Sequence, residues 1–174
     1  MDLFREKSVV VTGGASGMGR ALCEQLGAQG ANVTVADCNS GEAKQVVEKM
    51  TENGVQARFE HLDVTQAAEV KRVIESAISQ DGQLDYIFNL AGILIVGEAY
   101  DLSVEDWSNI IDTNLKGVIY GTAIAYQIMV KQGFGHIVNM SSYQGLIPAG
   151  AATAYSATKY GVVGLSTSLR SEAA

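Results

Sequence analysis

Residues 8–19 read Ser8-Val9-Val10-Val11-Thr12-Gly13-Gly14-Ala15-Ser16-Gly17-Met18-Gly19. The β-branched run at 9–11 predicts a buried strand, and the glycines after it predict a tight turn. Residues 20–26 predict a helix, because Met18, Leu22 and Leu26 share one helical face. Unpaired N–H groups at the start of that helix, together with its dipole, form an anion site suited to a pyrophosphate. The order strand, glycine turn, helix therefore indicates a dinucleotide site; the alternative is an ordinary turn that needs glycine for close packing.

The composition is that of a globular protein. The chain has 174 residues, of which 47% are hydrophobic and 18% charged, which predicts a single domain over residues 1–174. The net charge of −7 argues against a nucleic-acid partner. The sequence shows neither a run of ~18 apolar residues nor the apolar core of a signal peptide, so no membrane partner and a cytoplasmic location are expected. Cys23 and Cys38 lack metal-site spacing and are predicted to be buried reduced thiols, and no metal site is expected.

Strand-like and helix-like segments alternate along the whole chain. This alternation predicts an α/β fold, a Rossmann-type doubly wound parallel sheet with helices on both faces. After the first unit, the predicted strands cover residues 32–36, 55–62, 84–90 and 136–140. Helices are predicted between them, including a long helical region over 103–131, which begins with a capping box at Ser103 and Asp106, and a last helix from about Tyr155.

Asp37 lies 18 residues after Gly19 (37 − 19), at the carboxyl end of the second predicted strand. In a dinucleotide fold, a carboxylate here accepts hydrogen bonds from the adenosine ribose diol and repels a 2′-phosphate. Neither the glycine turn before Gly19 nor Cys38 offers a basic side chain to receive that phosphate. NAD is therefore favoured over NADP, although Asp37 taken alone would be an ordinary residue at the start of a loop.

Tyr155 and Lys159 lie four residues apart and therefore on one face of the last predicted helix. An ammonium about 5 Å from a phenol stabilises the phenolate by roughly 3 kcal/mol at an effective dielectric of about 20. Such stabilisation favours proton transfer near neutral pH. Ser142 follows the strand at 136–140, at the same carboxyl edge of the sheet as the glycine turn, where doubly wound folds bind ligands. The alternative for Tyr155 and Lys159 is a solvated helix face.

In their order and spacing, these motifs resemble the short-chain dehydrogenase/reductase family from Lys7 to the last residue. The motifs that carry the resemblance are Thr12 to Gly19, Leu62-Asp63-Val64, Asn89-Leu90-Ala91-Gly92, Asn114, Ser142, Tyr155 and Lys159. The resemblance implies that Asp63 and Val64 contact the adenine and that Asn89 to Gly92 support the sheet and the cofactor. With the residues above, the expected cofactor-binding set is Gly13, Ser16, Gly17, Met18, Gly19, Asp37, Asp63, Val64, Asn89, Ala91, Gly92, Tyr155 and Lys159.

The resemblance also implies a catalytic tetrad of Asn114, Ser142, Tyr155 and Lys159. Tyr155 would exchange a proton with the substrate oxygen while hydride moves between NAD and an alcohol or ketone. Lys159 would assist Tyr155 and hold the nicotinamide ribose, Ser142 would bind the substrate oxygen, and Asn114 would place a water. The neighbouring Ser141 is expected to point the other way along the strand. The substrate stays open, because Ile93, Leu94, Leu146 and Ile147 suit an apolar pocket wall and a loop core equally.

The sequence departs from the family pattern in two ways. Leu90 stands where the family more often has a second Asn. Family members usually continue with another strand, helix and strand, which help to close the pocket and which this chain, stopping at residue 174, is expected to lack. The expected strand order 3-2-1-4-5 would leave residues 136–140 at an edge, which favours self-association. The resemblance further implies a homo-oligomer in which the long helices, near Trp107–Lys131 and Tyr155–Glu172, pair between subunits. A truncated, inactive dinucleotide-binding fragment and an NAD-sensing interaction protein are the alternatives to an enzyme.

Overall fold

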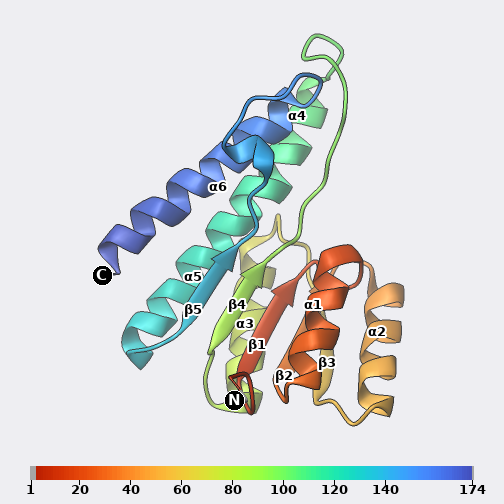
Figure 1. Ribbon diagram of the computed structural model, residues 1–174, viewed down its shortest axis with the longest axis vertical. Helices are drawn as coiled ribbons and strands as arrows, with labels where there is room; N and C mark the ends of the chain where they lie inside the picture. The colour runs from red at the N-terminus through yellow and green to blue at the C-terminus, as the bar shows by residue number, and fades with distance from the viewer. Residues whose placement is uncertain (1–2, 174) are drawn as a thin grey trace.

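The computed structural model describes residues 3–173, in which five strands alternate with helices (Figure 1). The first half contains β1 (Ser8–Thr12), α1 (Gly17–Ala28), β2 (Asn32–Asp37), α2 (Ser40–Glu52), β3 (Ala57–His61), α3 (Ala67–Asp81) and β4 (Tyr86–Asn89). The second half contains α4 (Val104–Ile111), the π-helix η1 (Asp112–Lys116), α5 (Gly117–Gln132), β5 (His136–Asn139), the 3₁₀ turn η2 (Tyr143–Gly145) and α6 (Thr153–Glu172). No helix within residues 3–173 is long and apolar enough to cross a membrane.

The five strands form one sheet in the order β3-β2-β1-β4-β5, and every neighbouring pair is parallel. This confirms the predicted doubly wound sheet. In the register of the sheet, Thr12 is aligned with Ala36 on one side and Asn89 on the other, so the residues that follow β1, β2 and β4 emerge together at one edge. Figure 1 shows the arrows of β1, β4 and β5 pointing towards this edge.

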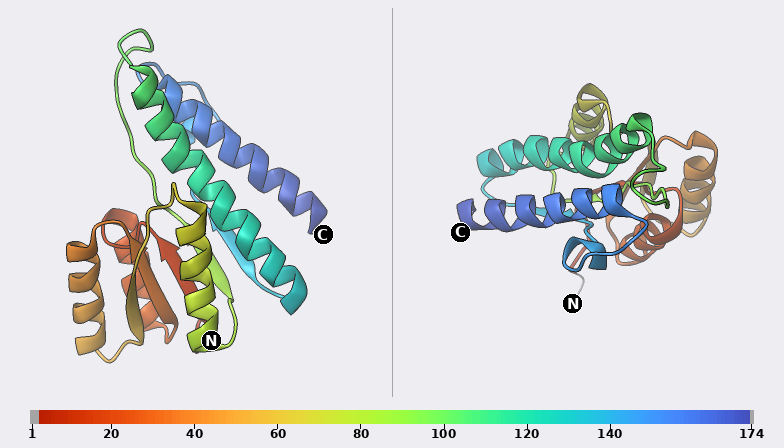
Figure 2. Two further views of the ribbon diagram at one scale, coloured as in Figure 1. Left: turned by 180° about the vertical axis from the view of Figure 1, so that it is seen from behind. Right: turned by 90° about the horizontal axis from the view of Figure 1, so that it is seen from above.

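Each face of the sheet carries its own apolar core. Val9 and Val11 of β1 face a cluster with residues of α1 and α2, whereas Val10 faces a cluster with residues of α3 and α5. Because side chains alternate between the two faces of a strand and both faces are covered, every residue of β1 is buried, and its three central residues, Val9 to Val11, form a continuous apolar run. Helix α6 contacts α4 and η1, and Figure 2 shows it running alongside the rod formed by α4, η1 and α5.

Two strands begin later than predicted because the apolar residues before them bind helices. The backbone N–H of Val55 donates to the Met50 carbonyl at the end of α2, 3.0 Å away. Leu84 is fully buried, but its N–H and carbonyl both bind the Gln132 side-chain amide, each at 3.0 Å. The predicted range 103–131 is helical with η1 in its middle, and the Ser103–Asp106 capping box is confirmed.

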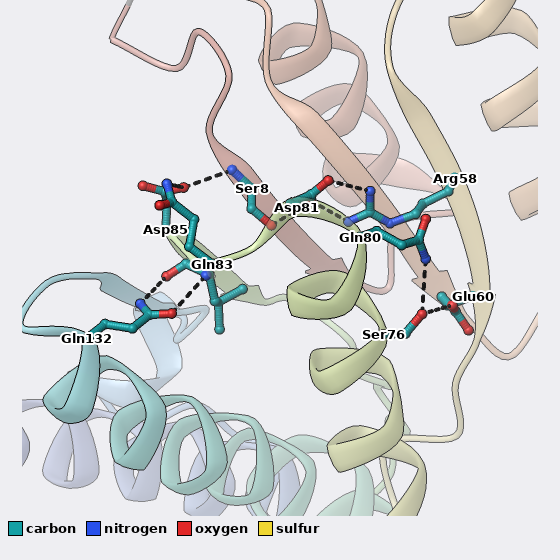
Figure 3. Close-up of polar contacts among 10 residues, drawn as sticks. Ser8, Arg58, Glu60, Ser76, Gln80, Asp81, Gln83, Asp85 and Gln132 are labelled. Atoms are coloured by element: carbon teal, nitrogen blue, oxygen red, sulfur yellow. Dashed lines mark hydrogen bonds and ion pairs between the residues drawn. The ribbon is translucent and has the colours of Figure 1, made fainter.

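Polar side chains clamp the opposite, amino edge of the sheet (Figure 3). Asp81, at the end of α3, accepts hydrogen bonds from Arg58 of β3 at 3.0 Å and from the Ser8 hydroxyl at 2.7 Å. Buried Asp85 accepts from the Ser8 N–H and from Lys7, each at 2.9 Å. Burial raises the pKa of Asp85, but hydrogen bonds from Lys7, Ser8 and Gln83 together hold it below the usual 3.8. These contacts join β1, β3, α3 and the segment before β4 at the edge remote from the dinucleotide motif.

Candidate active site

A pocket of about 390 Å³ lies at the carboxyl ends of the central strands. It brings together the glycine turn and the segments that follow β2, β3 and β4. Its lining residues are Gly13, Ser16, Gly17, Met18, Gly19, Asp37, Cys38, Leu62, Asp63, Val64, Leu90, Ala91, Gly92, Ile93 and Thr113. Most of the expected cofactor residues therefore share one cavity; Asn89, Tyr155 and Lys159 are the expected residues that do not line it.

The glycine turn forms one wall of the pocket, and two of its glycines cannot carry a side chain without strain or collision. Gly13 adopts a left-handed backbone with φ of +70°, which favours glycine, and a Cβ at Gly19 would collide with the Gly13 carbonyl oxygen. Helix α1 begins at Gly17, so its first turn, including Met18 and Gly19, borders the cavity. A helix start at the wall of a cavity presents unpaired N–H groups to an anion, as a pyrophosphate requires.

Asp37 connects the end of β2 to the glycine turn. One carboxylate oxygen accepts from the Ala15 N–H at 3.0 Å, and the other accepts from the Asn39 N–H at 2.9 Å. Among residues 3–173, the lining set contains neither lysine nor arginine, and its charged members are Asp37 and Asp63. Arg20, just beyond the turn, donates to Glu24 on its own helix at 3.2 Å. The charged side chains that line this cavity are therefore all acidic.

Asp63 and Val64 form a fixed corner after β3. One oxygen of Asp63 accepts from both the N–H and the hydroxyl of Thr65, at 2.9 and 2.8 Å, while the Asp63 N–H donates to Glu69 at 2.9 Å. Val64 is buried. The position of Asp63 is therefore set by local hydrogen bonds, and that of Val64 by packing.

Residues 90–93 are held by side chains from β1 and from η1. The Thr12 hydroxyl oxygen accepts from the N–H groups of Leu90 and Ala91, at 3.1 and 3.2 Å. The side chain of fully buried Asn114 binds both backbone polar groups of Ile93. Its oxygen accepts from the Ile93 N–H at 2.7 Å, and its amide donates to the Ile93 carbonyl at 2.8 Å. Asn89 lies beneath this segment, also buried, and donates to Asn139 at 2.8 Å.

Tyr155 and Lys159 face one another along α6, as their spacing predicts. The Lys159 ammonium lies 5.5 Å from the centre of the Tyr155 ring. Lys159 is buried and donates to the Met140 carbonyl at 2.8 Å, and this burial lowers the pKa of its ammonium. The Ser142 hydroxyl oxygen accepts from the Gln144 N–H at 3.2 Å, whereas the Ser141 hydroxyl donates to the Lys159 carbonyl at 3.0 Å. The two serines thus have different partners, which fits the expected divergence of their side chains.

The structure corrects one prediction about the thiols. Cys23 is buried as predicted, and burial raises its pKa to about 12. Cys38 is exposed and lines the pocket, because it follows the last residue of β2 and leaves the sheet. Thr113, next to Asn114, also lines the pocket and was not predicted; its position beside a motif residue was the available signal.

Two loops, one between β4 and α4 and one between β5 and α6, carry exposed apolar side chains. Ile93, Leu94, Leu146 and Ile147 are between 39% and 68% exposed, so they do not form a loop core. The loops are joined by a backbone hydrogen bond from Gly97 to Ala151 at 2.9 Å.

A second hollow, of about 680 Å³, follows the outer edge of β5 between α5 and α6. Its walls are mainly apolar and include Met129, Phe134, Ile137 and Leu169. Among the described residues, β5 has a partner strand on one side only.

Comparison with known proteins agrees with this geometry. Residues 7–174 match the family described as short chain dehydrogenase. The chain is 38% identical over 159 residues to a cyclopentanol dehydrogenase of Comamonas sp. (strain NCIMB 9872), covering 91% of this chain and 64% of that protein. It is also 38% identical over 162 residues to a 3-alpha-(or 20-beta)-hydroxysteroid dehydrogenase of Mycobacterium tuberculosis (strain ATCC 25618 / H37Rv), covering 93% and 61%.

Solved structures agree as well. A short chain dehydrogenase/reductase from Burkholderia phymatum, crystallised in complex with NAD, superimposes with a TM-score of 0.93 at 31% identity, covering 95% of this chain and 59% of that one. The chain belongs to the short-chain dehydrogenase/reductase family. It spans about 64% of the length of the cyclopentanol dehydrogenase that it matches.

Proposed function

We propose that this protein is an NAD-dependent oxidoreductase that interconverts an alcohol and a carbonyl compound. The observation that carries the proposal is the Lys159 ammonium 5.5 Å from the Tyr155 ring, on a helix at the same sheet edge as the glycine-lined pocket. NAD bound in this pocket would supply the hydride acceptor for the substrate carbon. The protein's own residues have to bind the cofactor, hold the substrate oxygen and accept its proton.

Tyr155 is the proposed general base for alcohol oxidation. It takes the hydroxyl proton of the substrate, and in the reverse direction it returns that proton to the carbonyl oxygen. The Lys159 ammonium stabilises the phenolate electrostatically. Ser142 donates a hydrogen bond to the substrate oxygen, and Asn114 orders the site through the Ile93 peptide and places a water for proton exchange.

NAD is the proposed cofactor. The glycine backbone at Gly13 and Gly19, beside the start of α1, admits a pyrophosphate, and the carboxylate of Asp37 suits the ribose diol. The remaining members of the proposed binding set are Ser16, Gly17, Met18, Asp63, Val64, Asn89, Ala91, Gly92, Tyr155 and Lys159.

The proposed substrates are uncharged secondary alcohols and their ketones. The apolar side chains exposed on the two loops favour such a ligand. The names of the two dehydrogenase relatives point to the same chemistry, since cyclopentanol and 3-alpha- or 20-beta-hydroxysteroids are secondary alcohols.

Replacing Tyr155 by Phe tests the mechanism. With cyclopentanol as the probe alcohol and NAD reduction as the readout, Tyr155→Phe is expected to lower kcat by on the order of 10²-fold or more. Its affinity for NAD, measured by calorimetry, should stay within about twofold, because the substitution removes one oxygen and keeps every other residue of the proposed binding set. Lys159→Ala should weaken both turnover and NAD binding.

Tyr160→Phe is the matched control, since Tyr160 is an exposed tyrosine on the same helix. It should behave like the parent chain. Near-normal turnover in Tyr155→Phe would remove the proposed mechanism. Binding of NAD without turnover across a panel of cyclic and open-chain alcohols would favour a dinucleotide-binding protein without this activity.

A further inference from the structure

Three consecutive residues at the end of β5 bind α6. The Asn139 side-chain amide donates to the Ser166 hydroxyl oxygen at 3.1 Å. The Met140 carbonyl accepts from the Lys159 ammonium at 2.8 Å, and the Ser141 hydroxyl donates to the Lys159 carbonyl at 3.0 Å. Since Lys159 and Ser166 are about two helical turns apart, the helix is fixed to the strand at two levels.

Asn139 extends this attachment to the centre of the sheet. Its side-chain oxygen accepts from the Asn89 amide at 2.8 Å and from the Thr122 hydroxyl at 3.1 Å. Both of these donors belong to buried residues. A Cβ at Gly121 would collide with the Asn89 side chain, so the close approach of α5 to β4 depends on glycine at that position. One amide therefore joins β4, α5, β5 and α6.

We infer that Asn139 is a positioning residue, which sets α6 against β5 so that Tyr155 and Lys159 lie in a productive arrangement with Ser142. This inference rests on the proposed function. Ser142 follows Asn139 by three residues on the same strand end, while Tyr155 and Lys159 belong to the attached helix. Small displacements between groups that act on one substrate oxygen cost much of the rate.

The chemistry of the amide explains why asparagine suits this position. Its oxygen accepts two hydrogen bonds while its nitrogen donates a third, without placing a charge near Lys159. Leucine has a similar volume, but it would leave the Asn89 amide, the Thr122 hydroxyl and the Ser166 hydroxyl without this partner. Buried donors without partners are costly, so the junction of β4, α5, β5 and α6 at Asn139 would rearrange.

The titration of Lys159 reports on this junction directly. Competitive acetylation with acetic anhydride over a range of pH, followed by peptide mass spectrometry, gives the midpoint for each lysine, with exposed Lys49 as the internal reference. Asn139→Leu and Ser166→Ala should move the Lys159 midpoint upward, towards the ordinary pKa of 10.5, because a loosened helix lets water reach the ammonium. Ser166→Thr keeps the hydroxyl and should retain the parent midpoint, as should Ser168→Ala, which changes an exposed serine of the same helix.

Turnover provides a second readout. In Asn139→Leu, kcat for cyclopentanol is expected to fall on the order of tenfold, while KM and the Kd for NAD stay within about twofold. A loss of fold stability alone would leave the Lys159 midpoint of the folded protein unchanged. If Asn139→Leu does not fold, the pair Ser166→Ala and Ser166→Thr decides the question.

An unshifted Lys159 midpoint in Asn139→Leu, or in Ser166→Ala if the former fails to fold, would overturn the inference, whatever the turnover. A shifted midpoint in a chain that binds NAD but oxidises none of the alcohols would support the junction and contradict the proposed function instead.

Discussion

At the scale of single residues, Asp37 uses both carboxylate oxygens within the protein, one on Ala15 of the glycine turn and one on Asn39. Removing it should therefore disturb the glycine turn as well as the proposed ribose site. We expect Asp37→Ala to bind NAD on the order of tenfold more weakly and to show a smaller preference for NAD over NADP, because a charge-assisted hydrogen bond and the repulsion of a 2′-phosphate are lost together. Calorimetry with both cofactors measures the two effects.

Asp37→Asn separates these contributions. It keeps an oxygen that can accept from Ala15 but removes the charge. It should therefore bind NAD more tightly than Asp37→Ala does, while its preference for NAD over NADP should still be smaller than that of the parent. Equal affinity of the parent chain for NAD and NADP would contradict the assignment of Asp37.

Motif residues at strand ends could be predicted because a parallel sheet brings its carboxyl ends together, as Gly13, Asp37, Asp63 and Ala91 illustrate. The exposure of Cys38 could not, since cysteine is usually buried and one residue decides whether it belongs to the strand or to the loop. Thr113 lies in a π-helix beside Asn114, and the regular helical period used for prediction does not reveal such a segment, although the neighbouring motif residue does mark its place.

At the scale of elements, the amino-edge clamp should contribute a pH-dependent part of the stability. The pKa of Asp85 lies below 3.8 in the folded state, so its ionised form stabilises the protein above that pH, and the contribution is lost as the pH falls through the folded pKa. We expect Asp85→Asn to lower the free energy of unfolding by about 1–3 kcal/mol at pH 7. The difference from the parent should narrow below pH 3.8 in urea-unfolding experiments.

Asp101→Asn, at an exposed carboxylate, is the control and should unfold like the parent at every pH. If the free energy of unfolding of Asp85→Asn stays below that of the parent by the same amount in acid, the contribution of Asp85 does not depend on its charge.

The strands and helices that show a clear apolar pattern were predicted correctly, and so was the order of the five strands in the sheet. Their ends were less accurate for a physical reason. Val55 and Leu84 are apolar, but their backbone groups bind α2 and Gln132, and hydrophobicity alone does not distinguish a strand residue from one packed beneath a helix.

At the scale of the whole molecule, β5 is the feature that bears on assembly. Its outer edge borders an apolar hollow, and Val138 on it is 38% exposed. An apolar strand edge of this kind attracts a further strand. We expect the 174-residue chain to self-associate, which size-exclusion chromatography with light scattering will detect. Val138→Lys should raise the monomer fraction if association uses this edge.

Ile119→Lys probes the other route, since Ile119 is exposed on α5, does not line that hollow, and a homo-oligomer through the long helices would bury that helix. The two variants therefore distinguish strand pairing from helix pairing. A chain that remains monomeric across the concentration range would contradict both.

The different environments of the two thiols allow one of them to be labelled selectively with a fluorescent dye. Cys38 stands exposed on the wall of the cavity, whereas Cys23 is buried with a pKa of about 12. A maleimide dye should therefore attach at Cys38 alone, and saturating NAD should slow that labelling several-fold by covering the thiol. Cys38→Ser should not be labelled. Equal labelling rates of the parent with and without NAD would show that the dinucleotide binds elsewhere. Occupancy of the cavity could then be followed by fluorescence before any substrate is identified.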